Sequence, residues 1–101
     1  MTTKTREILS QVAVEDTAHV LRCLGHPIRL RILDVLEKGG EATVTEIYEA
    51  LDVEQAVASQ HLTTMWDKGI LRRRKDGVHV YYAIGDQRAL KVLDCLRHGN
   101  C

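Results

Sequence analysis

The side chains best suited to chemistry with a partner gather between Glu54 and Asp86. The first part of this stretch, EQAVASQHLTTM, has the period of an amphipathic helix. Its apolar face is formed by Val57, Ala58, His61, Leu62 and Met65. Its other face is formed by Gln55, Ser59, Gln60, Thr63 and Thr64. Short amide and hydroxyl side chains are able to hydrogen-bond base edges in the major groove of DNA, whereas a merely solvated face usually carries Lys and Glu.

A basic arm and a hairpin signal follow this helix. Gly69 is placed to end the helix in a left-handed conformation, and the arm Ile70–Lys75 leads to Asp76-Gly77, a strong signal for a tight turn. Val78–Ile84 then returns as a second strand. Four consecutive cations, residues 72–75, lie beside the turn, where they would suit contacts with DNA phosphates. The alternative interpretation is a charged hairpin packed on an ordinary surface helix.

Further helices are expected before this region. One helical pattern runs from Arg6 to about Leu24, and it allows a break near Glu15-Asp16. The next predicted helix, Ile28–Lys38, follows Pro27, which suits the first turn of a helix. A capping-box spacing over residues 43–46 then predicts the start of a short helix.

The order of elements predicts the fold class. The short link Asp52-Val53 joins the capping-box helix to the polar-faced helix as a helix-turn-helix pair. After the hairpin, Asp86 is placed to cap a last helix, Gln87 to about His98, which Gly99 would end. The predicted fold is therefore mainly α with a small β-hairpin wing (α+β), a winged helix-turn-helix. The length suits one domain over residues 1–101, with residues 1–5 expected to be disordered.

Composition argues against several classes of protein. The formal net charge is zero, so the basic surface is local, and it contrasts with five acids and no cation between Glu41 and Glu54. No stretch approaches the roughly 20 apolar residues of a membrane span, and the start lacks the apolar region of a signal peptide, so a cytoplasmic protein is expected. No nucleotide loop, nucleophile elbow or paired-carboxylate cleft is recognisable. An enzyme is therefore not expected, and neither is a cofactor.

The sequence resembles the ArsR/SmtB family of bacterial winged-helix repressors. The resemblance covers about residues 16–97 and is carried by LRCLGHPIRLRILDVL, VASQHLTTM, the GIL exit and the RRRKDGVHVYYAI wing. It implies a homodimeric repressor that binds double-stranded operator DNA and releases it when an effector binds or a thiol is modified. The resemblance assigns the recognition role to Gln55, Ala56, Ser59 and Gln60, and the wing tip to residues 75–79.

Residue types and resemblance together give a set of DNA-binding candidates and an oligomeric state. The candidates are Gln55, Ala56, Ser59, Gln60, Thr63, Arg73, Arg74, Lys75 and His79. His61 is expected to pack half-buried rather than to contact DNA. The terminal helices carry more apolar surface than a small domain is able to cover, which predicts a dimer interface; alternatively, they pack on each other. A two-fold dimer would match palindromic DNA.

The family's two common metal motifs are incomplete in this sequence. The thiolate pair at the start of the third helix would fall around residues 43–46, which include no cysteine. The motif of the last helix requires Asp and His two residues apart, yet Asp86 is followed by Gln87 and Arg88, and only His98 lies near the helix end. Sensing in these two modes is not expected, and no metal ligand is assigned.

The candidate sensing residues are Cys23, Cys95 and Cys101. Three cysteines are an odd number and too few for a secreted disulfide scaffold, so they are expected to be free thiols, ligands or redox sensors. Oxidation or a persulfide bridge between Cys23 and Cys95 would bias the dimer between two arrangements. The second-helix cysteine of some thiol-sensing members would fall near Asp34, so this pairing would differ from theirs. Alternatively, the cysteines are structural and pack as small hydrophobic residues without sensing anything.

Two further uses of these cysteines involve a metal or metalloid. Cys95 with Cys101 would resemble the C-terminal thiolate clusters of arsenite-responsive members. A mixed set would instead suit zinc or a similar soft ion, and it consists of His19, Cys23, Cys95 and His98.

A winged-helix adaptor that binds protein rather than DNA is the remaining alternative. Trp66 supports it, because a large exposed indole often marks a contact, although this ring could equally pack on Tyr81 or Tyr82. The polar helix face and the cations argue against an adaptor, since an adaptor would more often expose apolar residues there.

Overall fold

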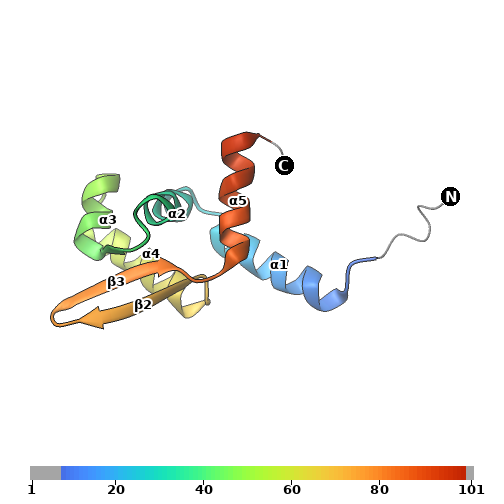
Figure 1. The fold of residues 1–101 in the computed structure, drawn as a ribbon, viewed down its shortest axis with the longest axis horizontal. Helices are drawn as coiled ribbons and strands as arrows, with labels where there is room; N and C mark the ends of the chain where they lie inside the picture. The colour runs from blue at the N-terminus through green and yellow to red at the C-terminus, as the bar shows by residue number, and fades with distance from the viewer. Residues whose placement is uncertain (1–7, 100–101) are drawn as a thin grey trace.

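The structure is a computed structural model that describes residues 8–99. These residues form five helices and a small antiparallel sheet. In chain order the elements are α1 (Gln11–Leu24), α2 (Pro27–Gly39), β1 (Ala42–Thr43), α3 (Val44–Leu51), α4 (Gln55–Asp67), β2 (Leu71–Asp76), β3 (His79–Ile84) and α5 (Gln87–His98). Figure 1 shows β2 and β3 projecting from the helices as a wing, with α1 extending on the other side. The predicted fold class is confirmed. The expectation for residues 1–5 lies outside the described residues.

The sheet has one strand more than the predicted hairpin. Its order is β1-β3-β2, and both pairs of neighbouring strands are antiparallel. β1 has only two residues, so it is too short to show the alternation from which a strand is recognised. It pairs Ala42 with Tyr82 and Thr43 with Tyr81. This pairing joins the segment before α3 to the wing.

The hairpin turn lies one residue later than predicted. β2 and β3 pair from Leu71 with Ile84 to Asp76 with His79, so the two-residue loop is Gly77-Val78. Gly77 has a φ of +64°, whereas Val78 has no positive φ. A positive φ at the first loop position alone is the pattern of a type II′ turn, which favours Gly there. The predicted turn at Asp76-Gly77 and the predicted strand start at Val78 are therefore wrong by one residue.

Helix boundaries follow the capping residues. α1 starts at Gln11, where the Ser10 hydroxyl accepts a hydrogen bond from the Ala13 N–H at 3.1 Å. Residues 8–10 are not helical, so the predicted helix from Arg6 is wrong, and α1 continues through residues 15 and 16 without a break. The predicted Asp86 cap is confirmed, as is the end of α5 at Gly99.

Helix α2 organises the core. It packs against each of the other helices and against the sheet, and its Ile32 and Leu33 have no exposed surface. α4 turns Ala58, Leu62 and Met65 into the same core, also without exposed surface. The position of α4 and the wing is therefore set by apolar packing on α2.

No helix within residues 8–99 is long and apolar enough to cross a membrane.

Candidate nucleic-acid interface

The pair α3 and α4 forms the predicted helix-turn-helix. α3 begins with a complete capping box: the Thr43 hydroxyl accepts from the Glu46 N–H at 3.2 Å, and the Glu46 carboxylate accepts from the Thr43 N–H at 2.8 Å. α3 ends at Asp52, whose φ of +56° is left-handed and redirects the chain. α4 starts three residues later at Gln55, so local chemistry at both ends of α3 determines the entry of α4.

α4 has one buried face and one exposed polar face. The exposed residues on the polar face are Gln55, Ala56, Gln60 and Thr63, and Ser59 is half-buried beside them. α4 carries no Lys, Arg, Asp or Glu before Asp67. The amides and hydroxyls therefore lie on a helix face that carries no charged side chain of its own. This arrangement suits hydrogen bonding to base edges.

One face of the wing is continuous with α4. Side chains alternate along a strand, so Arg73 and Lys75 share the face of the buried Leu71. The guanidinium carbon of Arg73 lies 3.6 Å from the centroid of the Trp66 ring, a cation–π contact. Trp66 thus packs on the wing through Arg73. Within residues 8–99 no carboxylate pairs with Arg73 or Lys75.

Arg74 and His79 lie on the other face of the wing. Arg74 donates two hydrogen bonds to the Glu41 carboxylate, at 3.1 and 2.5 Å, and its guanidinium carbon lies 4.4 Å from the Tyr81 ring centroid. The Arg74 hydrogen bond lowers the pKa of the Glu41 carboxyl. The exposed His79 ring lies 6.2 Å from the Tyr81 ring. Glu41 therefore offsets the charge of Arg74, which distinguishes this arginine from Arg73.

His61 joins the flank of α4 to the junction of α1 and α2. Arg29 donates from Nε to His61 Nδ1 at 3.1 Å and from Nη1 to the Cys23 carbonyl oxygen at 2.9 Å. The His26 ring packs edge-on against His61, with centroids 4.4 Å apart. Burial, followed by the nearby charges of His26 and Arg29, lowers the pKa of His61. His61 is half-buried, as predicted. No sequence pattern indicates a role for Arg29, which lies 32 positions before its partner His61.

Comparison with known proteins connects this geometry to a family. A family model described as a helix-turn-helix domain matches residues 24–74, from the end of α1 into β2. The transcriptional repressor PagR of Bacillus anthracis is 33% identical over 88 residues, which cover 87% of this chain and 88% of PagR. The crystal structure of PagR matches with a TM-score of 0.79 over 86% of this chain and 99% of that chain. The chain belongs to the ArsR/SmtB family of winged helix-turn-helix repressors.

Two other relatives agree with this ArsR/SmtB assignment. The cadmium resistance transcriptional regulatory protein CadC homolog of Staphylococcus aureus is 32% identical over 79 residues, covering 78% of this chain and 65% of that protein. The crystal structure of the transcriptional repressor BigR from Xylella fastidiosa matches with a TM-score of 0.81 at 25% identity, over 100% of this chain and 98% of that chain. The ArsR/SmtB chain is thus a DNA-binding transcriptional regulator and not an enzyme.

The candidate sensing cysteines of this ArsR/SmtB chain lie in different surroundings. Cys23 is buried and lines a cavity with Arg29 and Lys68, at the junction of α1, α2 and the end of α4. Cys95 is half-buried in a groove between α1 and α5. Cys101 lies outside the described residues. The structure therefore places Cys23 next to the support of α4, and Cys95 next to the terminal helices.

The histidines of the mixed zinc set have other contacts. His19 Nε2 lies 3.4 Å from the Lys68 carbonyl oxygen, and His98 Nε2 lies 3.0 Å from an Asp94 carboxylate oxygen. In the described part of the chain, no group of three or more His, Cys, Asp or Glu is placed to hold a metal ion. One chain therefore does not assemble His19, Cys23, Cys95 and His98 into a site, and that alternative is wrong for a single subunit.

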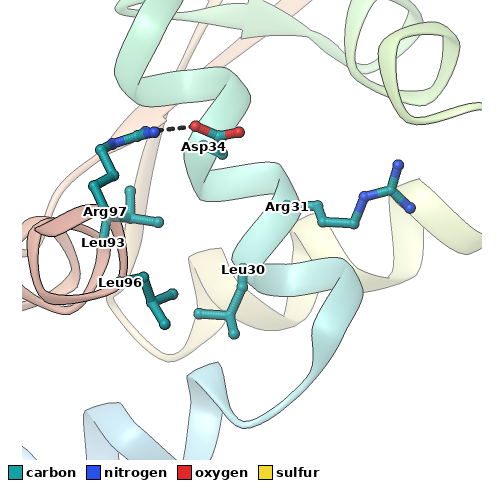
Figure 2. A pocket seen from close by; sticks show the side chains of 6 residues that line it. All are labelled: Leu30, Arg31, Asp34, Leu93, Leu96 and Arg97. Atoms are coloured by element: carbon teal, nitrogen blue, oxygen red, sulfur yellow. Dashed lines mark hydrogen bonds and ion pairs between the residues drawn. The ribbon is translucent and has the colours of Figure 1, made fainter. Parts of the chain in front are cut away.

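Ion pairs join α2 to α5 at the position near which the resemblance would place a second-helix cysteine. Figure 2 shows Arg97 of α5 directed at Asp34 of α2, and Arg97 also pairs with Glu37. The Arg97 hydrogen bond lowers the pKa of the Asp34 carboxyl. A cavity of about 270 Å³ beside them is lined by Leu30, Arg31, Asp34, Leu93, Leu96 and Arg97. In this chain the two helices are thus linked here by charge.

Proposed function

We propose that the chain is a homodimeric repressor that reads operator DNA with α4 and releases it when a cysteine thiol is modified. The observation that carries the reading role is the uncharged, exposed face of α4 beside the wing face of Arg73 and Lys75. Amide groups such as that of Gln60 would hydrogen-bond base edges, and the two wing cations would contact phosphates. His79 and Arg74, on the other wing face, would add contacts at the wing tip.

Exposed apolar side chains on the terminal helices support dimerisation. Val12, Leu21 and Leu96 are 67%, 51% and 58% exposed. Leu21 and Leu96 line the groove between α1 and α5, which has a volume of about 590 Å³. Apolar surface of this kind gains free energy when it leaves water, and a second copy related by a two-fold axis would cover it. The same axis would direct two α4 helices at palindromic half-sites.

Two routes support release by thiol modification. The Cys23 Sγ lies 3.8 Å from Arg29 Nη1, and Arg29 in turn donates to His61 of α4. An oxygen or sulfur atom added to Cys23 would displace Arg29 and disturb the support of α4. Cys95 lines the α1–α5 groove, so its modification would change the proposed dimer interface. A bond between Cys95 and Cys101 would act on the same helix.

The first test is a titration of the protein onto DNA from its own upstream region. The titration is made with reduced protein and after exposure to peroxide, organic persulfide, arsenite or zinc, and the intact mass is recorded each time. We expect tight binding that one agent abolishes at the mass of a disulfide, a sulfur bridge or a metal adduct. Binding that survives every agent would overturn release through cysteines. No binding by reduced protein would overturn the reading role and favour the adaptor.

Serine variants separate the two routes. Loss of the response in Cys23→Ser, with DNA binding retained, would assign release to the contact with Arg29. Loss of the response in both Cys95→Ser and Cys101→Ser would assign it to the end of α5. A response that persists when all three cysteines are replaced would exclude thiol chemistry altogether.

A further inference from the structure

A basic cavity lies where α1, α2 and the end of α4 meet. It has a volume of about 180 Å³ and is lined by His19, Arg22, Cys23, Arg29 and Lys68. His19 closes one side, because its Nε2 lies 3.4 Å from the carbonyl oxygen of Lys68. Arg29 contacts His61, so the cavity lies beside the half-buried flank of α4 and not beside its exposed polar face. The proposed DNA contacts therefore leave this cavity without a role.

The lining of the cavity carries positive charge only. Arg22, Arg29 and Lys68 are cations at neutral pH, His19 adds a titratable ring, and the lining contains no carboxylate. Over residues 8–99 the side chains of Arg22 and Lys68 take part in no ion pair. Cations that share a cavity repel one another, and an anion placed between them converts this repulsion into attraction. The cavity thus has the charge pattern of an anion site.

Two acids near the cavity already have partners. Asp86 interacts with the charge of His19, but it is bound to Arg88 at 2.9 Å. Glu15, one helical turn before His19, accepts a hydrogen bond from Gln11 at 2.9 Å. Neither carboxylate is a lining residue of the cavity, and each already binds another side chain.

Arg29 is held in position before any anion arrives. Its Nε donates to His61 Nδ1 at 3.1 Å, and its Nη1 donates to the Cys23 carbonyl oxygen at 2.9 Å. Among residues 8–99, Arg29 Nη2 donates to no other group, so it is left for an anion in the cavity that Arg29 lines with Arg22 and Lys68. A guanidinium fixed in this way loses little conformational entropy when it binds an oxyanion, which favours affinity.

We propose that this cavity binds a small, free oxyanion of the phosphate or sulfate class. Its volume of about 180 Å³ is below the roughly 300–1,000 Å³ of sites for drug-sized ligands and suits a small anion. Arg22 and Lys68 supply mobile charge, and Arg29 supplies directed N–H groups. Because the same guanidinium donates from Nε to His61, occupancy would be felt on the flank of α4.

The test is an NMR titration of the reduced, DNA-free protein with inorganic phosphate, with chloride adjusted to keep the ionic strength constant. We expect saturable shifts of the backbone amides of Arg22, Cys23 and Lys68, and competition by sulfate. Arg22→Gln and Lys68→Gln should each raise the dissociation constant for phosphate by about tenfold, because each removes one charge-assisted contact. Both side chains are exposed, and the remaining amide spectrum reports that the fold is intact.

Lys38→Gln is the matched control, since Lys38 lies at the end of α2, 70% exposed, outside the cavity lining. Its phosphate affinity should equal that of the wild type. Shifts that do not saturate, or that persist unchanged in Arg22→Gln, would overturn the proposal. So would a weaker salt dependence of DNA binding in Arg22→Gln without any phosphate shifts, which would assign the cations to the DNA backbone. Because the titration contains no DNA, its outcome is independent of the reading role of α4.

Discussion

The α4–wing surface and the α1–α5 surface are both exposed, but their chemistry is opposite. On α4 the aliphatic residues that face α2, such as Leu62, are covered inside the chain, and the exposed polar face consists mainly of amides and hydroxyls. On α1 and α5 the apolar residues themselves face water, as Leu21 and Leu96 do. Polar exposure suits a hydrated, charged partner such as DNA, whereas apolar exposure suits a second copy of the same surface. One chain therefore completes the proposed reading surface but supplies only half of the proposed dimer interface.

A charge placed on the apolar surface of α1 and α5 tests the proposed dimer interface and should have the largest effect. Leu21→Glu and Leu96→Glu would each bury an unpaired carboxylate in the dimer interface, at a cost of several kcal/mol. We expect the dissociation constant of the dimer to rise by more than about a hundredfold, as measured by analytical ultracentrifugation. Val78→Glu, at a wing-turn residue that is 92% exposed, is the control and should stay dimeric. A Leu21→Glu protein that remains a dimer would contradict the proposed interface.

Truncation of the polar face tests the other surface. Ser59→Ala and Gln60→Ala should each weaken binding to the operator by about 1–3 kcal/mol more than binding to unrelated DNA, if these side chains read bases. The measurement is a pair of titrations with operator and scrambled duplexes at one salt concentration. Equal losses on the two duplexes would mean that the side chains position the helix without reading sequence. Thr64→Ala serves as a control, because its hydroxyl already donates to the Gln60 carbonyl oxygen at 3.0 Å.

Features that depend on residues close together in the sequence could be predicted, whereas features that depend on distant residues could not. α4, its polar face and its Gly69 exit are encoded within some fifteen consecutive positions, and the structure has Gly69 at a φ of +82° as expected. The capping box at Thr43 and Glu46 is equally local. The predicted start of α1 is wrong because apolar spacing continues upstream of Ser10, whose hydroxyl nevertheless caps the helix there.

Contacts between residues far apart in the chain could not be predicted from the sequence. The Arg74–Glu41 pair spans 33 positions, and nothing in either neighbourhood identifies the other. Strand alternation predicts that Arg73 and Arg74 point to opposite faces of the wing. It does not predict that Arg73 contacts Trp66 or that Arg74 pairs with Glu41. The four consecutive cations therefore looked equivalent in sequence and are not equivalent in the structure.

This inequivalence of the wing arginines gives a smaller, paired prediction. Arg73→Gln should lower the slope of log affinity against log salt concentration by about 0.9, the change expected for one lost phosphate contact. Arg74→Gln should lower the slope by less, because Glu41 already neutralises this arginine in the free protein. Titrations of one DNA duplex over a range of salt concentrations measure both slopes. A larger change for Arg74→Gln would show that DNA displaces Glu41 and that the Arg74 face of the wing meets the backbone.

The smallest expected effect concerns His61, which lies between the two regions. Burial holds the pKa of folded His61 below its ordinary value of 6.5. Above pH 6.5 the ring is neutral in both states and its contribution to stability is complete. As the pH falls below 6.5, the unfolded chain binds a proton before the folded chain does, so the free energy of unfolding decreases. The wild type should therefore lose stability in urea between pH 7.5 and 5.

His61→Gln tests the origin of this loss, because Gln keeps an acceptor for Arg29 and removes the titration. The variant should lose less stability over the same pH range. The carboxyls with lowered pKa values, Asp34, Glu41 and Asp86, do not interfere, since their ordinary values of 3.8–4.5 already lie below this range. An equal loss in both proteins would place the acid sensitivity elsewhere. If the wild type also binds operator DNA more weakly at pH 5.5 than at pH 7.5 and His61→Gln does not, the bond between Arg29 and His61 supports the proposed reading position of α4.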